Sequence, residues 1–255
     1  MISLSAEVGL MLLVLGLYLY ESSVLLFCNQ AVLSPVRAKG WRVQFGLKQL
    51  NIRGKELCFA QLLMPSRPLF VLTWRFEDSA PVMLSTEAST KPPEAVAPMP
   101  WRPPAVASHQ ILMPIVWWLS IATFIVLPLG LFTSLGDAAV LFAGGMIYVG
   151  ILVLLIVLWR YRSHFQLSNK ELLSTAFEYL ICPPFALNII RRLSLKIQIE
   201  DDLEPIAHSL QSPQAWLVTR NVMLERLDDQ IAYEAQDTAR YASLLSHRQK
   251  LQAQD

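Results

Sequence analysis

Charged residues are scarce in this sequence, and the scarcity is uneven. Asp, Glu, Lys and Arg make up 16% of the 255 residues, whereas a typical soluble domain carries about 25%. The deficit comes from three apolar stretches, one near the N-terminus and two in the middle of the chain. This distribution argues against a soluble globular protein and predicts an integral membrane protein with polar attachments.

Cysteine is rare as well. The three cysteines, Cys28, Cys58 and Cys182, lie far apart, and no C-x-x-C pair occurs. This pattern argues against a disulfide framework and against a zinc ribbon. Unpaired, reduced thiols are typical of cytoplasmic proteins, so we expect the soluble parts of the chain on the cytoplasmic side.

Motifs of known enzyme classes are absent. The four histidines are isolated, without an H-E-x-x-H arrangement, and there is no G-x-S-x-G, Walker A or G-x-G-x-x-G sequence. We therefore expect no metal and no cofactor, and a non-catalytic protein is the favoured interpretation.

The two central apolar stretches are residues 111–133 and 138–159, and neither contains a charge. They hold 23 and 22 residues and are separated by only four. At about 1.5 Å per residue, helices of this length cross a hydrocarbon layer roughly 30 Å thick. Residues 109–160 are therefore predicted to form a transmembrane helical hairpin.

Residues 1–33 are predicted to form a third transmembrane helix. A cleaved signal sequence is not expected, because no Lys or Arg precedes the apolar core. Glu7 lies near the start of this predicted span, and Glu21 is the one acid placed to lie within the membrane. It is either a proton or cation site within the bilayer or a headgroup-level residue beside Tyr18 and Tyr20. The second interpretation is favoured, because the other two spans offer no ionisable partner.

The third span carries a run of small side chains that would let helix backbones approach closely. This predicted helix-packing seam consists of Ala139, Ala143, Gly144, Gly145 and Gly150. It is either a subunit interface or a packing surface within the hairpin or against the first span, and the sequence leaves both open.

The basic residues predict the orientation. Ten of the 21 lie between the first and second spans and eleven follow the third, whereas the N-terminal residues and the hairpin turn have none. By the positive-inside rule the N-terminus is outside and the C-terminus is cytoplasmic. We expect a multi-pass protein of a bacterial inner membrane.

Residues 34–78 are predicted to form a small, basic, cytoplasmic antiparallel β-meander. Residues 41–48 alternate apolar and polar side chains, as a strand with one buried face does, and residues 56–63 and 69–76 read as two further strands. Three short strands bury too little surface to be stable alone, so this sheet needs a partner layer. Residues 79–108 contain seven prolines and are predicted to be a linker.

Between residues 37 and 75 there are eight basic side chains and one acid. Such a patch suits nucleic acid, anionic lipid or an acidic protein surface. Anionic lipid explains the charge next to a membrane, so nucleic acid is the less favoured partner.

Residues 161–255 are predicted to be a cytoplasmic helical region. Ser168 and Glu171 fit the S-x-x-E capping box at the start of one helix. Ser212 and Pro213 signal the start of another, in which apolar residues recur at near-heptad spacing to about residue 249. This long helix is either a coiled coil or an amphipathic helix packed on its own protein.

Residues 185–196 form a short apolar helix candidate that carries Arg191, Arg192 and Lys196 near its end. The helix either lies in the membrane interface with these three side chains on lipid headgroups or is a buried helix on the neighbouring sheet. The interfacial placement is favoured slightly, because the helix is short, basic and close to the third span.

Together these features predict a membrane scaffold or accessory subunit that holds partner proteins at the cytoplasmic face. Expected partners are membrane lipids and other membrane or cytoplasmic proteins, including further copies of the chain. Two alternatives are a transport component that uses Glu21 and a membrane enzyme that acts on lipid-linked substrates.

Overall fold

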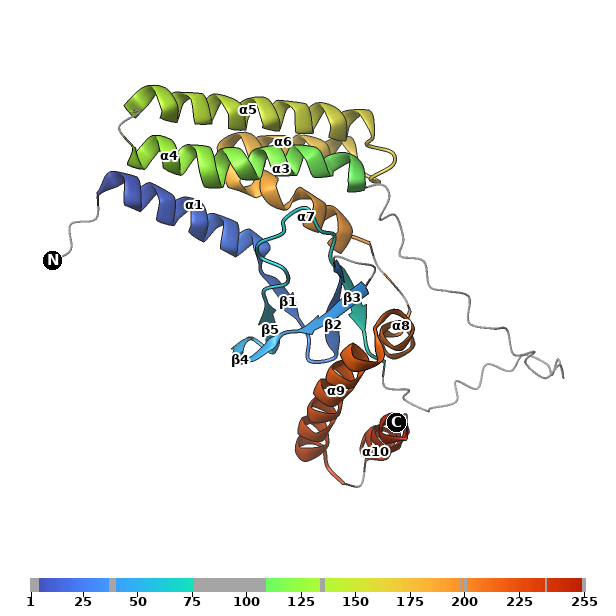
Figure 1. The fold of residues 1–255 in the computed structure, drawn as a ribbon. Helices are drawn as coiled ribbons and strands as arrows, with labels where there is room; N and C mark the ends of the chain where they lie inside the picture. The colour runs from blue at the N-terminus through green and yellow to red at the C-terminus, as the bar shows by residue number, and fades with distance from the viewer. Residues whose placement is uncertain are drawn as a thin grey trace.

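A computed structural model of the chain describes residues 5–36, 40–75, 109–133, 136–197, 199, 201–236 and 238–253. The predicted proline-rich linker therefore lies outside the described residues. Figure 1 shows three parts: a layer of long helices, a small β-domain next to it, and a group of C-terminal helices on the far side of the β-domain.

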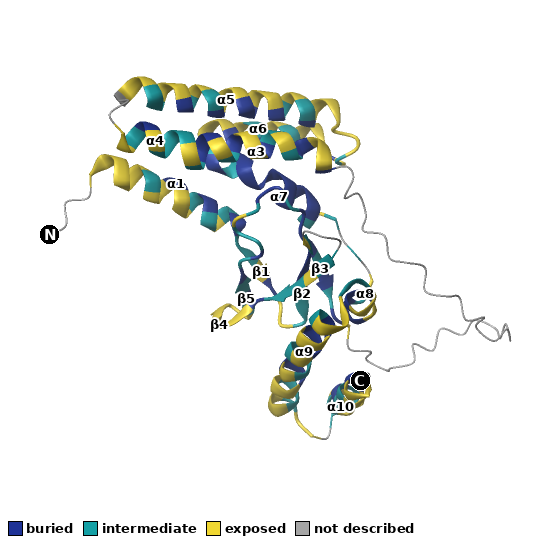
Figure 2. Ribbon diagram, in the orientation of Figure 1, coloured by how far each residue is buried: buried dark blue, intermediate teal, exposed yellow. Residues whose placement is uncertain are grey.

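The helical layer contains two helices that are long and apolar enough to cross a membrane. They extend over Gln110–Phe132 and Asp137–Arg160, with mean hydropathies of 2.2 and 2.8. The first comprises a short 3-10 turn (Gln110–Leu112), α3 (Met113–Ile121), a π-helical turn (Ala122–Val126) and α4 (Leu127–Phe132), and the second is α5 (Gly136–Arg160). Most of their outward side chains are exposed, as the yellow of Figure 2 shows.

The predicted third span is wrong. Helix α1 (Ala6–Ser22) has 17 residues and is therefore only about 25 Å long, short of a roughly 30 Å hydrocarbon layer. It ends at Ser22 because the following residues, Val24–Leu26, pair as strand β1 with β5. The apolar residues before Leu33 thus belong to two structures, a helix and the first strands of a sheet.

The predicted seam packs mainly within the hairpin. A Cβ at Gly150 would lie 2.7 Å from Leu119 Cδ2, and Gly130 of α4 meets Ala139. Ala143 is fully buried. Nothing lies within 4 Å of a Cβ at Gly144 or Gly145 among the described residues, so these two glycines do not contribute to the packing of the hairpin.

The β-domain consists of two antiparallel three-stranded sheets rather than one three-stranded meander. The first, sheet A, has the order β1-β5-β4, and the second, sheet B, has the order β3-β2-β6. Their bounds are β1 (Val24–Leu26), β2 (Gln30–Val36), β3 (Gly40–Phe45), β4 (Leu47–Ile52), β5 (Lys55–Cys58) and β6 (Phe70–Thr73). The three predicted strands overlap β3, β5 and β6. The predicted strand 41–48 also includes the first two residues of β4. Strands β1 and β2 were missed because they continue an apolar run that was assigned to a helix.

Two apolar cores hold the β-domain in place. Leu26, Val32, Cys58 and Leu69 are buried between the two sheets. The opposite face of sheet B packs against α8 (Leu203–Leu210), α9 (Pro213–Tyr233) and α10 (Ala239–Gln252). These helices are the partner layer that the small sheet needs.

The segment that connects the helical layer to the β-domain begins at the predicted helix start. Helix α6 (Asn169–Ile181) begins with the predicted capping box, in which Ser168 and Glu171 each accept from the other's backbone N–H. A 3-10 segment (Pro183–Asn188) and α7 (Ile189–Leu195) follow. The predicted long C-terminal helix is wrong, because it is interrupted after Tyr233 and α10 returns along α9, where Arg248 pairs with Asp228 at 2.7 Å.

Candidate functional site

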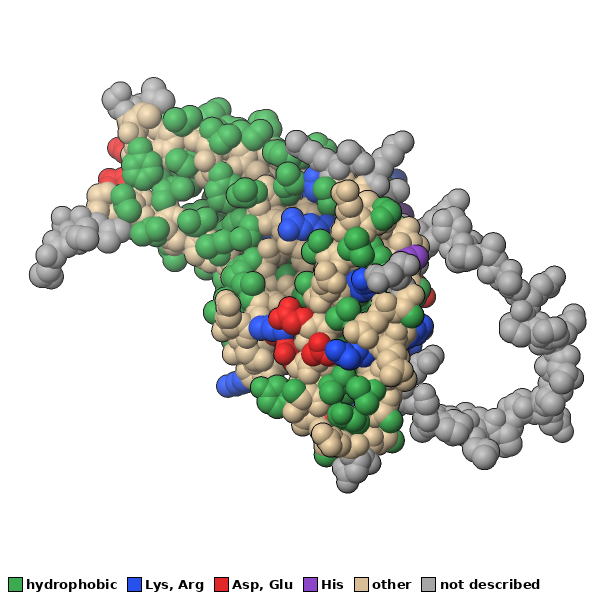
Figure 3. Space-filling model, turned by 60° about the horizontal axis from the view of Figure 1, so that its bottom comes forward, with side chains coloured by type: hydrophobic (Ala, Val, Ile, Leu, Met, Phe, Trp, Pro, Cys, Tyr) green, Lys and Arg blue, Asp and Glu red, His purple; other side chains and the backbone are tan. Residues whose placement is uncertain are grey.

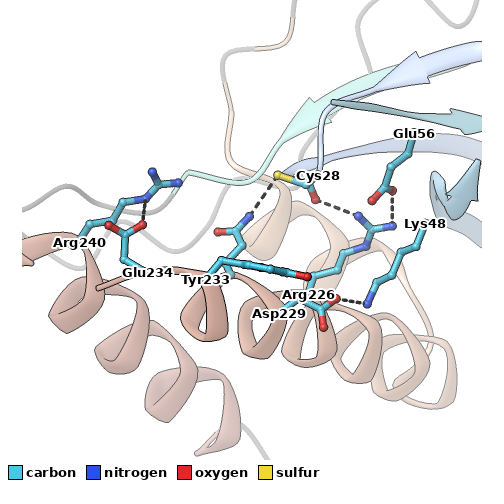
Figure 4. Close-up of a pocket in the computed structure, with 9 residues that line it drawn as sticks. Cys28, Lys48, Glu56, Arg226, Asp229, Tyr233, Glu234 and Arg240 are labelled. Carbon is cyan, nitrogen blue, oxygen red and sulfur yellow. Dashed lines mark hydrogen bonds and ion pairs between the residues drawn. The ribbon is translucent and has the colours of Figure 1, made fainter. Parts of the chain in front are cut away.

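A charged cleft lies between α9 and the β-domain. It has a volume of about 310 Å³, and Figure 4 shows the side chains that line it. Its walls come from the β1–β2 turn, from strands β4 and β5, from α9 and the segment that follows it, and from the start of α10. The lining residues are Cys28, Lys48, Glu56, Arg226, Asp229, Gln230, Tyr233, Glu234 and Arg240.

Arg226 forms the floor of the cleft and ties α9 to both sheets. Its guanidinium donates to the carbonyl of Cys28 at 3.0 Å, to the carbonyl of Gly46 at 2.8 Å and to Glu56 Oε2 at 2.7 Å. It also lies 4.8 Å from the centre of the Phe45 ring. The Arg226 and Glu56 side chains are only 4% and 8% exposed, so their ion pair is shielded from water.

Lys48 closes one side of the cleft. Its ammonium group donates to Glu225 at 2.8 Å and also to Asp229, one turn further along α9. Partial burial works against the charge, but the two carboxylates raise the pKa of Lys48 overall. Lys48 is therefore positively charged throughout the physiological range and joins strand β4 to α9.

The rim of the cleft is accessible. Tyr233 is 93% exposed, and Figure 4 shows its ring pointing along the cleft. Beyond it Glu234 and Arg240 face each other, with Oε2 and Nε 3.7 Å apart. Cys28 Sγ accepts a hydrogen bond from Gln230 Nε2 at 3.2 Å.

Charged side chains make up most of the lining of this cleft. Its charges are paired with one another, and the described residues contain no group of His, Cys, Asp and Glu side chains placed to hold a metal ion. Figure 3 shows that basic and acidic side chains lie side by side on this face of the molecule, whereas the helical part is largely hydrophobic.

Glu21 lies at the end of α1, next to a pair of charges that sequence analysis did not connect to it. Arg192 of α7 and Glu178 of α6 form an ion pair within electrostatic range of Glu21. Burial raises the pKa of Glu21, Arg192 opposes this effect and Glu178 adds to it. The other two predicted spans offer Glu21 no ionisable neighbour. In the structure its ionisable neighbours, Arg192 and Glu178, come from the C-terminal region.

The three predicted headgroup contacts are in different environments. Arg191 is 2% exposed and donates to the carbonyl of Gln61, so its side chain is directed into the protein. Arg191 is buried because α7 lies between the helical layer and the β-domain (Figure 1). This burial lowers the pKa of Arg191. Arg192 pairs with Glu178, and Lys196 Nζ lies 2.8 Å from Glu171 Oε1.

Sequence analysis missed the residues that form the cleft. The one available signal was the pair of acids Glu225 and Asp229, which lie four residues apart on one face of a predicted helix. Their basic partner, Lys48, lies far away in the sequence, so spacing alone did not connect them.

Comparisons of the chain with protein-family models, with curated proteins and with solved structures gave no match.

Proposed function

We propose that the protein is a membrane-anchored scaffold subunit that binds a partner protein in the charged cleft. In this proposal the hairpin formed by α3, α4 and α5 is the anchor. Its exposed side chains include Leu141, Phe142 and Ile156, which are 76%, 65% and 63% exposed. Apolar surface of this extent is unfavourable in water and suits a lipid environment.

The observation that supports partner binding is the composition of the cleft rim. Tyr and Arg are the residue types that most often dominate binding energy at protein interfaces. Tyr233 presents almost its whole side chain, and the Arg240 side chain is 58% exposed. Both lie beside a recessed surface of mixed charge, which suits a polypeptide partner with complementary charges.

The support under the rim is rigid. Arg226 fixes α9 to three backbone and side-chain acceptors, and Lys48 fixes it to β4. A surface that is already ordered loses less conformational entropy when a partner binds. The cleft therefore has the preorganisation expected of a docking site.

The orientation is part of the proposal. The basic residues on both sides of the hairpin favour a cytoplasmic location for the β-domain and for α8–α10. The partner is then a cytoplasmic protein or the cytoplasmic part of another protein of a bacterial inner membrane.

Photo-crosslinking tests this function. A photoreactive benzoylphenylalanine at Tyr233 should form an adduct with one protein species when native membranes are irradiated. The matched control is the same group at Leu217, which is also exposed on α9 but lies outside the cleft. No adduct at position 233, or the same adducts at both positions, would reject the cleft as the docking site.

A further inference from the structure

The outer face of sheet A carries apolar side chains where an exposed sheet face usually carries polar ones. In the strand register, Leu25 of β1 and Leu47 of β4 both pair with Leu57 of β5, so the three side chains form one row across the sheet. The opposite face of the sheet carries Leu26 and Cys58, which are buried against sheet B.

The row continues toward the β4–β5 turn. Ile52 pairs with Lys55, and Lys55 is two residues from Leu57 and so lies on the same face. The Lys55 ammonium group is 4.7 Å from the centre of the Phe27 ring. Leu25, Phe27 and Leu47 are each 47% exposed and Ile52 is 52% exposed, and Figure 2 shows β4 as exposed along its length.

We propose that this face of sheet A lies against the surface of an anionic lipid bilayer. The inference rests on the membrane anchoring proposed above and adds a second, peripheral contact to it. The first reason is continuity: only Ser23 separates α1 from β1, and Figure 1 shows β1 and β5 next to the end of α1. The sheet is thus held at the end of an apolar helix.

The second reason is charge. Arg53 and Lys55 lie at the β4–β5 turn, whereas the one acid of sheet A, Glu56, points inward to Arg226. An apolar surface with basic residues and no outward acid has the composition of an interfacial membrane contact.

A third observation is an exposed apolar side chain in a loop that is bonded to α1. Leu63 is 93% exposed, and its neighbour Leu62 accepts a hydrogen bond from the Tyr18 hydroxyl of α1. The loop that carries Leu63 is therefore fixed to the end of α1, as β1 is.

Spin-label accessibility tests the inference in the full chain reconstituted into vesicles. Labels are placed at Leu47 and Ile52 in a C28S/C182S background, which retains Cys58. Cys58 is 2% exposed and burial raises its pKa to about 11, so it stays unlabelled at neutral pH while the β-domain is folded. An unlabelled Cys58 therefore confirms the fold of each variant.

Labels at two reference positions give the accessibilities expected in lipid and in water. A label at Ile156 on α5 reports lipid, and a label at Tyr233 reports water. The compared quantity is the ratio of accessibility to oxygen over accessibility to a water-soluble nickel chelate. In vesicles of phosphatidylcholine and phosphatidylglycerol at a 7:3 ratio, this ratio at Leu47 and Ile52 should favour oxygen and lie between the ratios at Ile156 and Tyr233. If Ile156 also behaves as water-exposed, the membrane anchor itself fails.

Three outcomes would overturn the inference while Ile156 remains in lipid. Labels at Leu47 and Ile52 as accessible to nickel as the Tyr233 label would show a face in water. Labels shielded from both reagents would show a protein contact, such as a second copy paired through β4. In the wild-type sequence the two labels should also be more accessible to nickel in vesicles of phosphatidylcholine alone. This effect of phosphatidylglycerol should disappear in an R53Q/K55Q variant, and its persistence would contradict the role of the two basic residues.

Discussion

Replacing Arg226 with leucine tests whether a buried ion pair holds α9 on the sheets. The wild-type guanidinium makes hydrogen bonds of 3.0, 2.8 and 2.7 Å to Cys28, Gly46 and Glu56. Leucine removes all three and leaves the Glu56 carboxylate buried without its partner. Removing one member of a buried ion pair costs about 3–5 kcal/mol, so we expect the free energy of opening of the β-domain to fall by that amount.

Cys58 offers a direct assay, because its thiol is buried between the two sheets and reacts only when they open. Its labelling by a maleimide, followed by mass spectrometry of the Cys58 peptide, measures the free energy of opening when reclosing is fast. At about 1.36 kcal/mol per tenfold change, a loss of about 3–5 kcal/mol accelerates labelling roughly 150-fold to 5,000-fold.

Arg240→Leu is the matched control. The Arg240 side chain is 58% exposed and its carboxylate partner lies 3.7 Å away, so the substitution should cost less than about 1 kcal/mol and accelerate labelling less than about fivefold. In Glu56→Leu/Arg226→Leu the unpaired charge is also gone, and labelling should be slower than in Arg226→Leu. The reasoning is refuted if Arg226→Leu labels Cys58 no faster than Arg240→Leu does.

Three further substitutions follow from the same contacts. Gly46→Ala places a Cβ 2.3 Å from Glu56 Cβ and 3.2 Å from its backbone carbon; it should destabilise the β-domain by about 1–3 kcal/mol, and an unchanged urea midpoint would contradict the packing. Glu171 pairs with Lys196 and with the capping serine, which lower its pKa from 4.5 to about 2. Its stabilising effect is thus present above pH 4.5 and lost as the pH falls toward 2, so Glu171→Gln should lower the melting temperature at pH 6 but not at pH 2, and an equal loss at both would refute this assignment. Glu21→Gln should leave the adduct at the cleft rim intact, whereas a transport role for Glu21 predicts loss of activity.

The parts of the fold that sequence predicted are those specified by local signals. The two long uncharged runs required helices, and the capping box at Ser168 fixed the start of α6 because both of its hydrogen bonds form within one turn. The small residues of the third span were open to two interpretations, and the hairpin uses Ala139, Ala143 and Gly150 for its own packing.

The parts that sequence did not predict depend on contacts between distant segments. Residues 24–33 are apolar in either a helix or a buried strand, and the choice is made by the pairing of β1 with β5 and of β2 with β3 and β6. Short apolar runs leave this ambiguity in general. The hydrophobicity of the segment was read correctly, but its secondary structure was not.

The residues of the cleft could not be predicted from the sequence for the same reason. Arg226 and Glu56 are 170 residues apart, and Lys48 and Asp229 are 181 apart. Each residue alone resembles an ordinary surface charge of a helix or strand. Their common location follows only from the packing of α9 beside Gly46, which joins β3 to β4.

The most direct test of the account is the sidedness of the hairpin and of the β-domain. A membrane-impermeant maleimide should label Cys28, an exposed thiol of the β-domain, in inverted inner-membrane vesicles but not in intact spheroplasts. A cysteine placed at Thr133, at the end of α4, should show the opposite pattern in a C28S/C182S background. The account predicts these two patterns together with resistance of the protein to alkaline extraction. Labelling of both positions from the same side, or release of the protein at alkaline pH, would contradict it.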